Sequence, residues 1–397
     1  MTFKHDDNAQ IVNPSPVELR ENLTATHRES VQRPNLDEET KLRPLKVLMM
    51  GEALYRQGGI VTFQTLLIAS IAKHVSMQHI GTVGFGGPIK KLLTFAGCLL
   101  KLIKTLVFSK IDLVHLHVSL GPSFYRQCIV AIVCFIFRKP VLMHIHAGEL
   151  PSFYQQIGPL SRWLCRFVFR RCDRLIMLTE SWRPFYENSI GVEPKRLVTM
   201  ANPVNLPEFD AGDRKSETCQ FIYLGKMDKD KGTFDLLDAI AKVPQPMLQD
   251  SVRFIVAGNG EVERVREIVE RLGLNNCVTV FDWVEPEQRD SLLAESDVFV
   301  LPSYFEGMPM SLLEAMSWSM PVITTPVGGI PDFVVEGENG LLVQPGDIDG
   351  LSSAFAKLAN SADLRTSLGA AGRKRVESHC PNLYAKNMAH TYAELAR

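Results

Sequence analysis

Short apolar segments alternate with longer amphipathic segments along most of this chain, and no other feature of the sequence constrains the fold as strongly. The apolar segments cover residues 47–50, 111–116, 141–145, 175–178, 197–200, 221–224, 254–257, 278–281, 298–301 and 321–324. Short apolar strands that alternate with helices are typical of βαβ units, whose strands form a parallel sheet covered on both faces. The fold class is therefore predicted to be α/β.

A segment without periodicity interrupts the alternation and predicts two domains, which suits a chain of 397 residues. Residues 203–219 are rich in Pro, Asp, Glu and Gly and are interpreted as a linker. We expect two tandem Rossmann-like, doubly wound domains that face a cleft, one over residues 45–202 and one over residues 220–380. Residues 381–397 are expected to form a helix that packs back on the first domain. The polar residues 1–44 are expected to be a disordered tail.

The charge of the chain is balanced overall but concentrated locally. There are 43 Lys and Arg against 44 Asp and Glu, which argues against a protein that coats nucleic acid over its whole surface. Residues 88–171, however, contain twelve Lys and Arg and only two acids. This patch indicates a local anionic partner, and a membrane surface, a phosphorylated lipid or a nucleic acid are the candidates.

Two basic segments of this patch favour a membrane surface over nucleic acid. Residues 88–110 contain five lysines and residues 161–174 contain five arginines, in both cases among large apolar side chains. A helix with an apolar face and cationic flanks lies in the headgroup layer of an anionic membrane. The alternative is that the apolar faces pack on the sheet and the charges are merely solvated. The longest uninterrupted apolar run, residues 128–137, is too short to cross a bilayer, so no transmembrane helix is predicted.

The eight cysteines form no C-x-x-C pair, and the first residues lack the apolar core of a secretory signal. Most of these cysteines lie in apolar runs, which favours a reducing compartment. The chain is therefore expected to be cytoplasmic and peripheral on the inner face of the plasma membrane.

The first candidate site follows the apolar run 298–301. Glu306 is placed on a loop and Glu314 inside a helix, with Pro309 in the first turn of that helix. The free amides near Met310 and Ser311 would then form an anion site, and the two carboxylates would flank a bound phosphate. The alternative is an ordinary strand–loop–helix junction with two solvated glutamates.

Two further loops also follow predicted strands. Lys226 and Lys231 lie in a turn after residues 221–224, where they could neutralise a diphosphate leaving group, although charged surface turns are common. Asp228 and Asp230 in this turn resemble a metal pair only weakly, because an isolated D-x-D in a lysine-rich turn is usually solvated. A second loop, after residues 47–50, contains Gly58 and Gly59, whose backbone could approach a phosphate closely.

Four histidines lie in two pairs on adjacent predicted strands. His115 and His117 form one pair and His144 and His146 the other, so that the members of each pair face the same side of the sheet. Four histidines could bind zinc, but no other ligand type is spaced with them. His146 lies where a strand becomes a loop, and we expect it to contact substrate. No metal site is predicted.

These motifs resemble the retaining glycosyltransferases of family 4, which have the GT-B fold, and in particular the bacterial enzymes of polysaccharide and surface-glycan synthesis. The E-x7-E element from Glu306 to Glu314 is the best-known signature of that family, and YLGKMDKDKG resembles its G-R-x-x-x-x-K-G phosphate loop. The sequences RQGGI and LMHIHAGEL resemble its first-domain loops. The similarity covers about residues 46–397 and is strongest over residues 220–345.

The resemblance implies roles for individual residues. The catalytic group would be Glu306, His146 and Lys231, with Glu306 and His146 at the donor sugar and Lys231 at the diphosphate. Residues that bind the nucleotide or its diphosphate would be Gly58, Gly59, Lys226, Lys231, Gly258, Asn259, Val284, Gly307, Met310, Ser311 and Glu314, of which Glu314 would bind the ribose. Lys226 departs from the family's usual Arg, Asp282 from a common Gly, and Asp332 from a common Glu.

The implied function is transfer of a hexose from a nucleotide-diphosphate sugar, a UDP- or GDP-sugar, to a lipid-linked glycan acceptor with retained configuration. The first domain would bind the acceptor and the second the donor, without cofactor or metal. Two alternatives remain open. One is a nucleotide-sugar 2-epimerase of the same fold, and the other is a non-catalytic scaffold that binds lipid through the basic helices.

Overall fold

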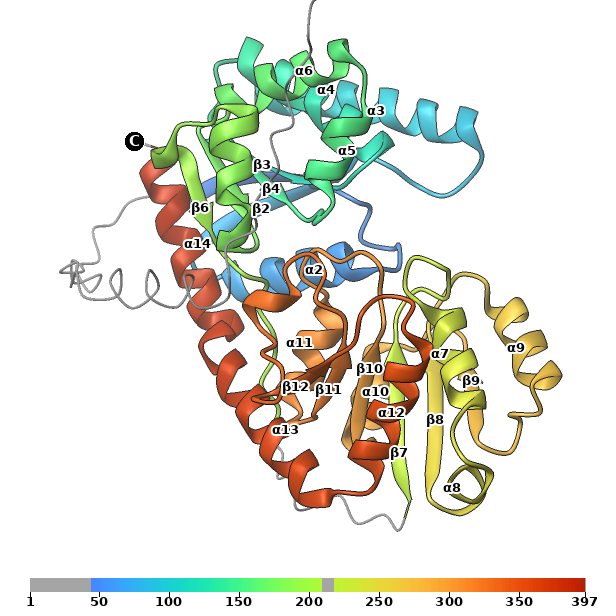
Figure 1. Cartoon of the computed structure of the whole chain (residues 1–397). Helices are drawn as coiled ribbons and strands as arrows, with labels where there is room; N and C mark the ends of the chain where they lie inside the picture. Colours follow the sequence, from blue (N-terminus) through green and yellow to red (C-terminus); the bar gives the residue numbers. More distant parts are fainter. Residues whose placement is uncertain (1–43, 209–217, 397) are drawn as a thin grey trace, which may run out of the picture. The chain divides into compact units, whose positions relative to one another are not determined.

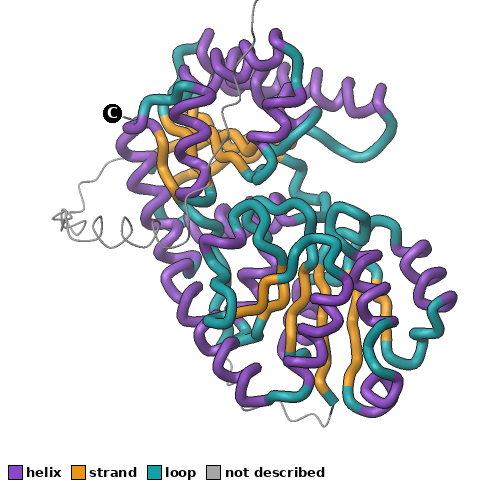
Figure 2. Tube along the Cα trace, viewed as in Figure 1, coloured by secondary structure: helices purple, strands orange, loops and turns teal. Residues whose placement is uncertain are grey.

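A computed structural model describes residues 44–208 and 218–396, which contain two six-stranded parallel sheets (Figures 1 and 2). The expected disordered tail, apart from Pro44, and most of the expected linker lie outside the described residues. The two sheets with their helices confirm the predicted α/β class with two Rossmann-like domains.

The first sheet has the strand order β2-β1-β3-β4-β5-β6. Its strands are β1 (Leu45–Gly51), β2 (Val75–Gly81), β3 (Leu113–Val118), β4 (Val141–Ile145), β5 (Arg174–Met177) and β6 (Leu197–Thr199). Its helices are α2 (Gly59–Ile71), α3 (Pro88–Phe108), α4 (Pro122–Ile136), α5 (Leu150–Gln156) and α6 (Pro159–Arg171), followed by the short helical segments η2 (Glu180–Trp182), η3 (Phe185–Ile190) and η4 (Pro194–Arg196).

The second sheet has the strand order β12-β11-β10-β7-β8-β9. Its strands are β7 (Cys219–Leu224), β8 (Val252–Ala257), β9 (Val278–Phe281), β10 (Val298–Leu301), β11 (Val322–Thr324) and β12 (Gly340–Leu342). The helices are α7 (Thr233–Ala241), α8 (Gln245–Asp250), α9 (Val262–Arg271), α10 (Pro286–Glu295), α11 (Met310–Ser317), α12 (Ile348–Ala359), α13 (Ala362–Val376) and α14 (Pro381–Leu395), with the short segments η6 (Ile330–Asp332) and η7 (Glu377–His379).

The ten apolar runs correspond to ten of the strands, and the two strands without such a run, β2 and β12, lie at sheet edges. An edge strand has one neighbour and exposes part of its surface, so its sequence need not be continuously apolar. In β2, VSMQHIG, buried and exposed positions are mixed. β12 has only three residues, which is too short for a recognisable pattern.

The strand orders determine where a ligand binds. In each sheet the order reverses next to the first strand, between β1 and β3 in the first sheet and between β7 and β10 in the second. Open parallel sheets bind ligands beyond the carboxyl ends of the strands at such a switch point. The loops that follow β1, β3, β7 and β10 are therefore the expected places for functional residues.

The last helix contributes to the core of the first sheet. Tyr384, Ala385, Met388 and Tyr392 of α14 are buried in one apolar cluster with side chains of β1 and α2. In Figure 1, α14 runs alongside the elements of the first sheet, although it follows the second sheet in the sequence. Both ends of the described chain therefore stabilise the same sheet.

Candidate active site

Lys231 and Glu306 form an ion pair at the switch point of the second sheet. Lys231 follows β7, Glu306 follows β10, and the distance from Lys231 Nζ to Glu306 Oε1 is 2.8 Å. Ser303 Oγ donates a second hydrogen bond of 2.8 Å to the same carboxylate oxygen. Glu306 is only 7% exposed. The carboxylate therefore holds the lysine in place.

The two lysines of the β7 loop differ in how firmly they are placed. Asp228 accepts a hydrogen bond from the backbone N–H of Lys231 at 3.0 Å and pairs with Lys226 Nζ at 2.6 Å. Lys231 is partly buried, whereas 61% of the Lys226 side chain is exposed. Because Asp228 is already engaged by both lysines, it is poorly placed to serve as a metal ligand.

The N-termini of α2 and α11 lie next to each other. Gly59 and Met310 are the first residues of the two helices, and a methyl group added at Gly59 would lie 3.7 Å from Met310 Cγ. The N-cap residues, Gly58 and Pro309, provide no side-chain cap. The amides of the first turns have no acceptor within their own helix, so both helices present N–H groups and positive dipole ends at one place.

One detail of this loop was predicted wrongly. Pro309 was expected in the first turn of the helix, but it is the N-cap residue, with an extended backbone, and the helix starts at Met310. The N-cap position suits Pro309 because the first helical hydrogen bond uses its carbonyl, which accepts from Leu313 N at 3.3 Å. The amides of Met310 and Ser311 remain in the first turn.

Glu314 points from the middle of α11 to an arginine that the sequence analysis did not identify. Arg289 Nη1 of α10 lies 2.9 Å from Glu314 Oε1. Burial raises the pKa of the Glu314 carboxyl, and the charge of Arg289 opposes this rise. No motif surrounds Arg289, and its contact depends on how α10 packs beside α11, so the sequence contained no signal for it.

The remaining predicted donor-site residues lie beyond β8 and β9. Gly258 follows β8 with a φ of 153°, and its Cα lies so close to the Gly225 carbonyl that an added methyl group would be 1.8 Å from the oxygen. Asn259 Nδ2 lies 3.4 Å from Gln57 Oε1, which links the second sheet to the β1 loop. Val284 is partly buried against the core. These residues therefore share the carboxyl edge of the sheet with Lys231.

The four histidines form an array of stacked rings on one face of the first sheet. His117 and His144 are register partners across β3 and β4, and the centroids of the His144 and His146 rings lie 4.3 Å apart. Phe63 of α2 packs edge-on against both of these rings at 4.9 Å. Burial lowers the pKa of His115 and of His146 to about 3, so both rings are neutral at pH 7.

Three of these histidines come close enough to be considered as metal ligands. His115, His117 and His144 each offer a ring nitrogen, and these atoms lie within 4.8 Å of one another. Neutral ring nitrogens are ordinary zinc ligands, so the histidines alone do not exclude a metal. A dication at this buried place would need charge compensation, however, and its neighbours Phe63 and Tyr384 are uncharged aromatic residues. The absence of a metal stays a prediction.

The loops after β4 and β10 interlock through glycines. A methyl group added at Gly148 would lie 1.9 Å from the carbonyl oxygen of Glu306, and one added at Gly307 would lie 2.6 Å from that of His146. Only residues without a Cβ allow these backbones to approach so closely. The contact brings His146 of the first sheet and Glu306 of the second to the same place.

Glu149 is a second residue that the sequence analysis did not assign. It lies three residues after His146. Burial raises the pKa of its carboxyl, and the positive charge of Lys231 lowers it. Its position after a central strand is a signal that could have identified it, because such loops converge at the switch point.

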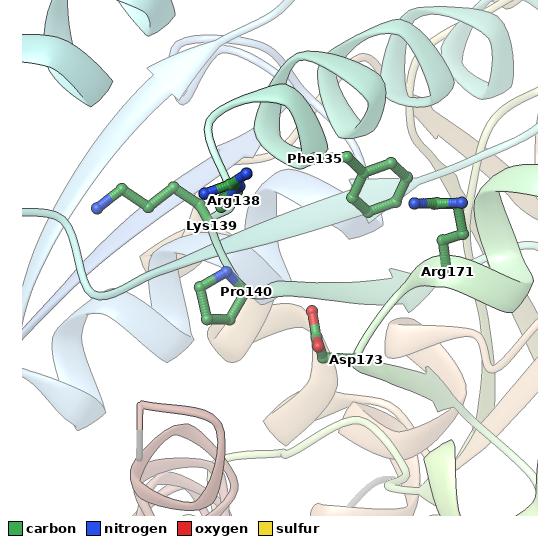
Figure 3. Close-up of a pocket in the computed structure, with 6 residues that line it drawn as sticks. All are labelled: Phe135, Arg138, Lys139, Pro140, Arg171 and Asp173. Atoms are coloured by element: carbon green, nitrogen blue, oxygen red, sulfur yellow. The ribbon is translucent and has the colours of Figure 1, made fainter.

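A surface cavity of about 270 Å³ is lined by a different set of residues (Figure 3). It is lined by Phe135, Arg138, Lys139, Pro140, Arg171 and Asp173, around the beginning of β4. Lys139 Nζ already donates to the Ile111 carbonyl, and Asp173 accepts from Val141 N. The cavity lies at the amino ends of β4 and β5, whereas the candidate site residues follow the carboxyl ends of the strands, so the cavity is not part of the candidate site.

The fold and the site together define a class of protein. Two Rossmann-like domains whose switch-point loops meet around a lysine–carboxylate pair and two helix N-termini form the GT-B architecture of glycosyltransferases. Residues 47–208 match the family described as Glycosyltransferase Family 4, and residues 207–375 match Glycosyl transferases group 1. Together these matches span most of the chain, which therefore belongs to the glycosyltransferases of GT-B type.

Individual relatives and solved structures agree with this assignment. The capsular polysaccharide biosynthesis glycosyltransferase CapM of Staphylococcus aureus is 33% identical over 156 residues, which cover 39% of this chain and 40% of CapM. An Escherichia coli UDP-Gal:alpha-D-GlcNAc-diphosphoundecaprenol alpha-1,3-galactosyltransferase is 26% identical over 50% of this chain and 54% of its own length. Anabaena HepE, solved with UDP, superposes with a TM-score of 0.68 at 18% identity, covering 88% of this chain and all of HepE.

The chain spans between 36% and 60% of the length of the curated relatives that it matches. Their activities are therefore not transferred to it as a whole. The likeness to HepE concerns the fold.

Proposed function

We propose that this protein transfers a hexose from a UDP- or GDP-sugar to a lipid-linked glycan acceptor, with retained configuration, in the synthesis of a bacterial polysaccharide or surface glycan. The first domain binds the acceptor and the second binds the donor. The convergence of the α2 and α11 N-termini, together with the pairing of Lys231 with Glu306 on the loop that leads into α11, carries the proposal. Support also comes from the complexes of HepE with UDP and UDP-glucose, and from relatives named for capsular polysaccharide and for a diphosphoundecaprenol acceptor.

The convergence suits a diphosphate that becomes a leaving group. Negative charge develops on the diphosphate as the bond to the sugar breaks. Donors and dipoles that are already oriented stabilise this charge without reorganising during the reaction. Two helix N-termini and one ammonium group, which Glu306 holds in place, provide such an environment. The barrier is lowered chiefly by charge stabilisation and positioning, not by a strong base.

A panel of nucleotide sugars tests the donor class. Only a ligand that binds the folded state raises the melting temperature, so the protein is heated with UDP-, GDP- and ADP-sugars in turn. We expect a UDP- or GDP-sugar to raise the melting temperature, and the same donor to yield product with the anomeric configuration of the donor. A protein that none of these sugars stabilises would contradict the proposed donor class.

Glu314 and its neutral counterpart provide a prediction for the ribose contact. In Glu314→Ala we expect the KM for donor to rise about tenfold or more, because both the ribose contact and the ion pair with Arg289 are removed. Transfer at donor concentrations near the wild-type KM should therefore fall several-fold. Glu314→Gln keeps a hydrogen-bonding group, so its KM for donor should lie between those of the wild type and Glu314→Ala. Steady-state kinetics against donor concentration measure the effect, and an unchanged KM in Glu314→Ala would exclude this role.

We predict that transfer continues in excess EDTA. Lys231 and the helix N-termini supply the positive charge that a divalent cation would otherwise provide, and Asp228 is held by two lysines. The rate is measured with EDTA and again after addition of Mg²⁺ or Mn²⁺. Loss of activity with EDTA and its recovery with either metal would contradict this prediction and make Asp228 and Asp230 candidate ligands again.

The proposed lipid-linked acceptor requires contact with a membrane, and α3 offers a surface for it. Phe95, Cys98, Leu102 and Leu106 are buried on one side of α3. A second series of apolar residues, separated by three or four positions, remains exposed on the same helix: Ile89, Leu93, Ala96, Leu100, Ile103 and Val107. The apolar residues of α3 therefore do not all pack on the sheet.

Exposed lysines of α3 and exposed apolar residues of α6 are further candidates for this contact. Lys90, Lys91, Lys101 and Lys104 are exposed on α3. On α6, Leu160 and Trp163 are exposed, whereas Arg162 is engaged with the carbonyls of Tyr154 and Gln155. None of the described helices is long and apolar enough to cross a bilayer. An apolar stripe with flanking lysines suits the headgroup layer of an anionic leaflet, and we propose the inner face of the plasma membrane.

Liposome flotation tests the membrane contact. Wild-type protein should float with anionic vesicles at low salt and less at high salt, because salt screens each lysine's contribution of about 1 kcal/mol. Changing Lys90, Lys91, Lys101 and Lys104 to Glu should abolish flotation. A matched variant with Lys229, Lys242, Lys357 and Lys374 changed to Glu alters the net charge equally and should still float. Wild-type protein that stays in the soluble fraction at low salt would contradict the membrane proposal.

A further inference from the structure

His146 contacts the neighbouring strand through a single ring nitrogen. The distance from its Nε2 to Nδ1 of His117, on β3, is 2.9 Å. Burial lowers the pKa of His117 as it does that of His146, and between two uncharged rings one nitrogen of this pair carries the hydrogen and the other accepts it. The pair therefore has two arrangements. If His117 Nδ1 donates, the hydrogen of the His146 ring is on its Nδ1. If His146 Nε2 donates, the hydrogen of the His117 ring is on its Nε2.

The surroundings of His117 distinguish the two arrangements. His117 is 2% exposed, and its Nε2 is buried without a hydrogen-bond partner. If His146 donated, His117 would have to carry its own hydrogen on Nε2 and bury an unpaired N–H group. If His117 donates from Nδ1, only a lone pair is left at Nε2. Unpaired buried N–H groups are the rarer and costlier case, so the geometry favours His117 as donor.

The other rings of the array pack around His146 but do not affect which ring donates the hydrogen bond. Both ring nitrogens of His144 lack a partner, so His144 affects His146 only by stacking at 4.3 Å. His115 Nδ1 is hydrogen-bonded to the hydroxyl of Tyr392 on α14 at 2.7 Å. Phe63 packs edge-on against His146 at 4.9 Å. His117 is the only residue among those described for which a side-chain hydrogen bond to His146 is recorded.

We propose that His117 is a positioning residue that holds His146 in the Nδ1–H tautomer, so that His146 presents an N–H donor to an acceptor oxygen of the bound sugar nucleotide. This inference rests on the proposed function, in which His146 contacts the donor. The matching group on the substrate is a hydroxyl or phosphate oxygen that accepts a hydrogen bond. Without His117, His146 exchanges between tautomers and presents a lone pair to the substrate part of the time.

The tautomer can be read directly from the free full-length protein. The ¹⁵N shifts and two-bond ¹H–¹⁵N correlations of ¹⁵N-histidine-labelled protein distinguish Nδ1–H from Nε2–H rings, and loss of one signal set in His146→Gln assigns His146. We expect a single Nδ1–H pattern at neutral pH. An Nε2–H pattern for His146 in the wild-type protein would overturn the proposal. This readout needs no turnover, so it is independent of whether the proposed transfer is correct.

A matched pair of variants tests the consequence. Each of two variants, His117→Phe and His144→Phe, replaces a buried imidazole of the array with a phenyl ring. Of these two histidines, only His117 is hydrogen-bonded to His146. We expect His117→Phe to lower kcat about tenfold or more and to give mixed tautomers at His146. His144→Phe should stay within about threefold of wild type with the Nδ1–H pattern intact.

A third variant guards against a purely structural effect. The side-chain amide of His117→Asn places an N–H near the position of Nδ1, and it should restore part of the activity and the Nδ1–H pattern. If His117→Phe and His144→Phe lower kcat equally and leave the tautomer unchanged, His117 has no positioning role. If neither variant folds, the tautomer of the wild-type protein still decides the question.

Discussion

Replacing Lys231 by Ala should lower the rate of sugar transfer about a hundredfold or more at saturating donor. The ammonium group is held by the buried Glu306 carboxylate at 2.8 Å and by the Phe305 carbonyl at 3.2 Å, both on the loop that leads into α11. In the proposed transfer its charge acts mainly where negative charge develops on the leaving diphosphate, so we expect its loss to affect the transition state more than the ground state. The measurement is kcat with the donor identified by thermal stabilisation.

Lys229 provides the control for this prediction. It lies in the same loop, but it is exposed and has no recorded ion pair among the described residues. Lys229→Ala removes the same charge and should leave kcat within about twofold of wild type. Thermal melts of both variants show whether each is folded. Near-normal turnover in folded Lys231→Ala would remove the lysine from the mechanism.

Gly148→Ala should reduce transfer by about a hundredfold while leaving nucleotide binding nearly unchanged. The added methyl group would lie 1.9 Å from the Glu306 carbonyl oxygen, so the loops after β4 and β10 must separate by about an ångström or more. A displacement of this size between reacting groups is enough for a loss of this magnitude. Kinetics give the transfer rate, and calorimetric titration with UDP or GDP gives the nucleotide affinity.

Gly158→Ala is the matched substitution. Nothing lies within 4 Å of a methyl group added at Gly158, and its φ of −67° suits any residue. This variant should transfer at the wild-type rate. If Gly148→Ala is folded and equally active, the close contact between the two loops does not exist in the working enzyme.

Much of the candidate site could be predicted from the sequence because of the parallel topology. In a parallel sheet the carboxyl ends of all strands lie at one edge, so residues just after an apolar run are brought together. Lys231, Glu306 and His146 each follow such a run, and the structure places the first two in contact and His146 beside the Glu306 loop. The predicted fold class rested on the same alternation and is confirmed.

The features that could not be predicted depend on packing between distant elements. Arg289 meets Glu314 only because α10 lies beside α11, and the hydrogen bond of His117 to His146 depends on the register of β3 and β4. The sequence showed that α3 is apolar on much of its surface, but not which apolar residues stay exposed. The edge strands β2 and β12 lack the continuous apolar pattern that burial on both faces imposes.

The fate of the sugar is the most direct test of the proposed glycosyl transfer. The protein is incubated with membranes and with UDP- or GDP-sugar labelled in the hexose, and the label is followed into the solvent-extractable lipid fraction. We predict that label enters this fraction with wild-type protein, with or without EDTA, and not with Lys231→Ala. Label that appears only as free or epimerised sugar, or that remains in the donor, would contradict the account.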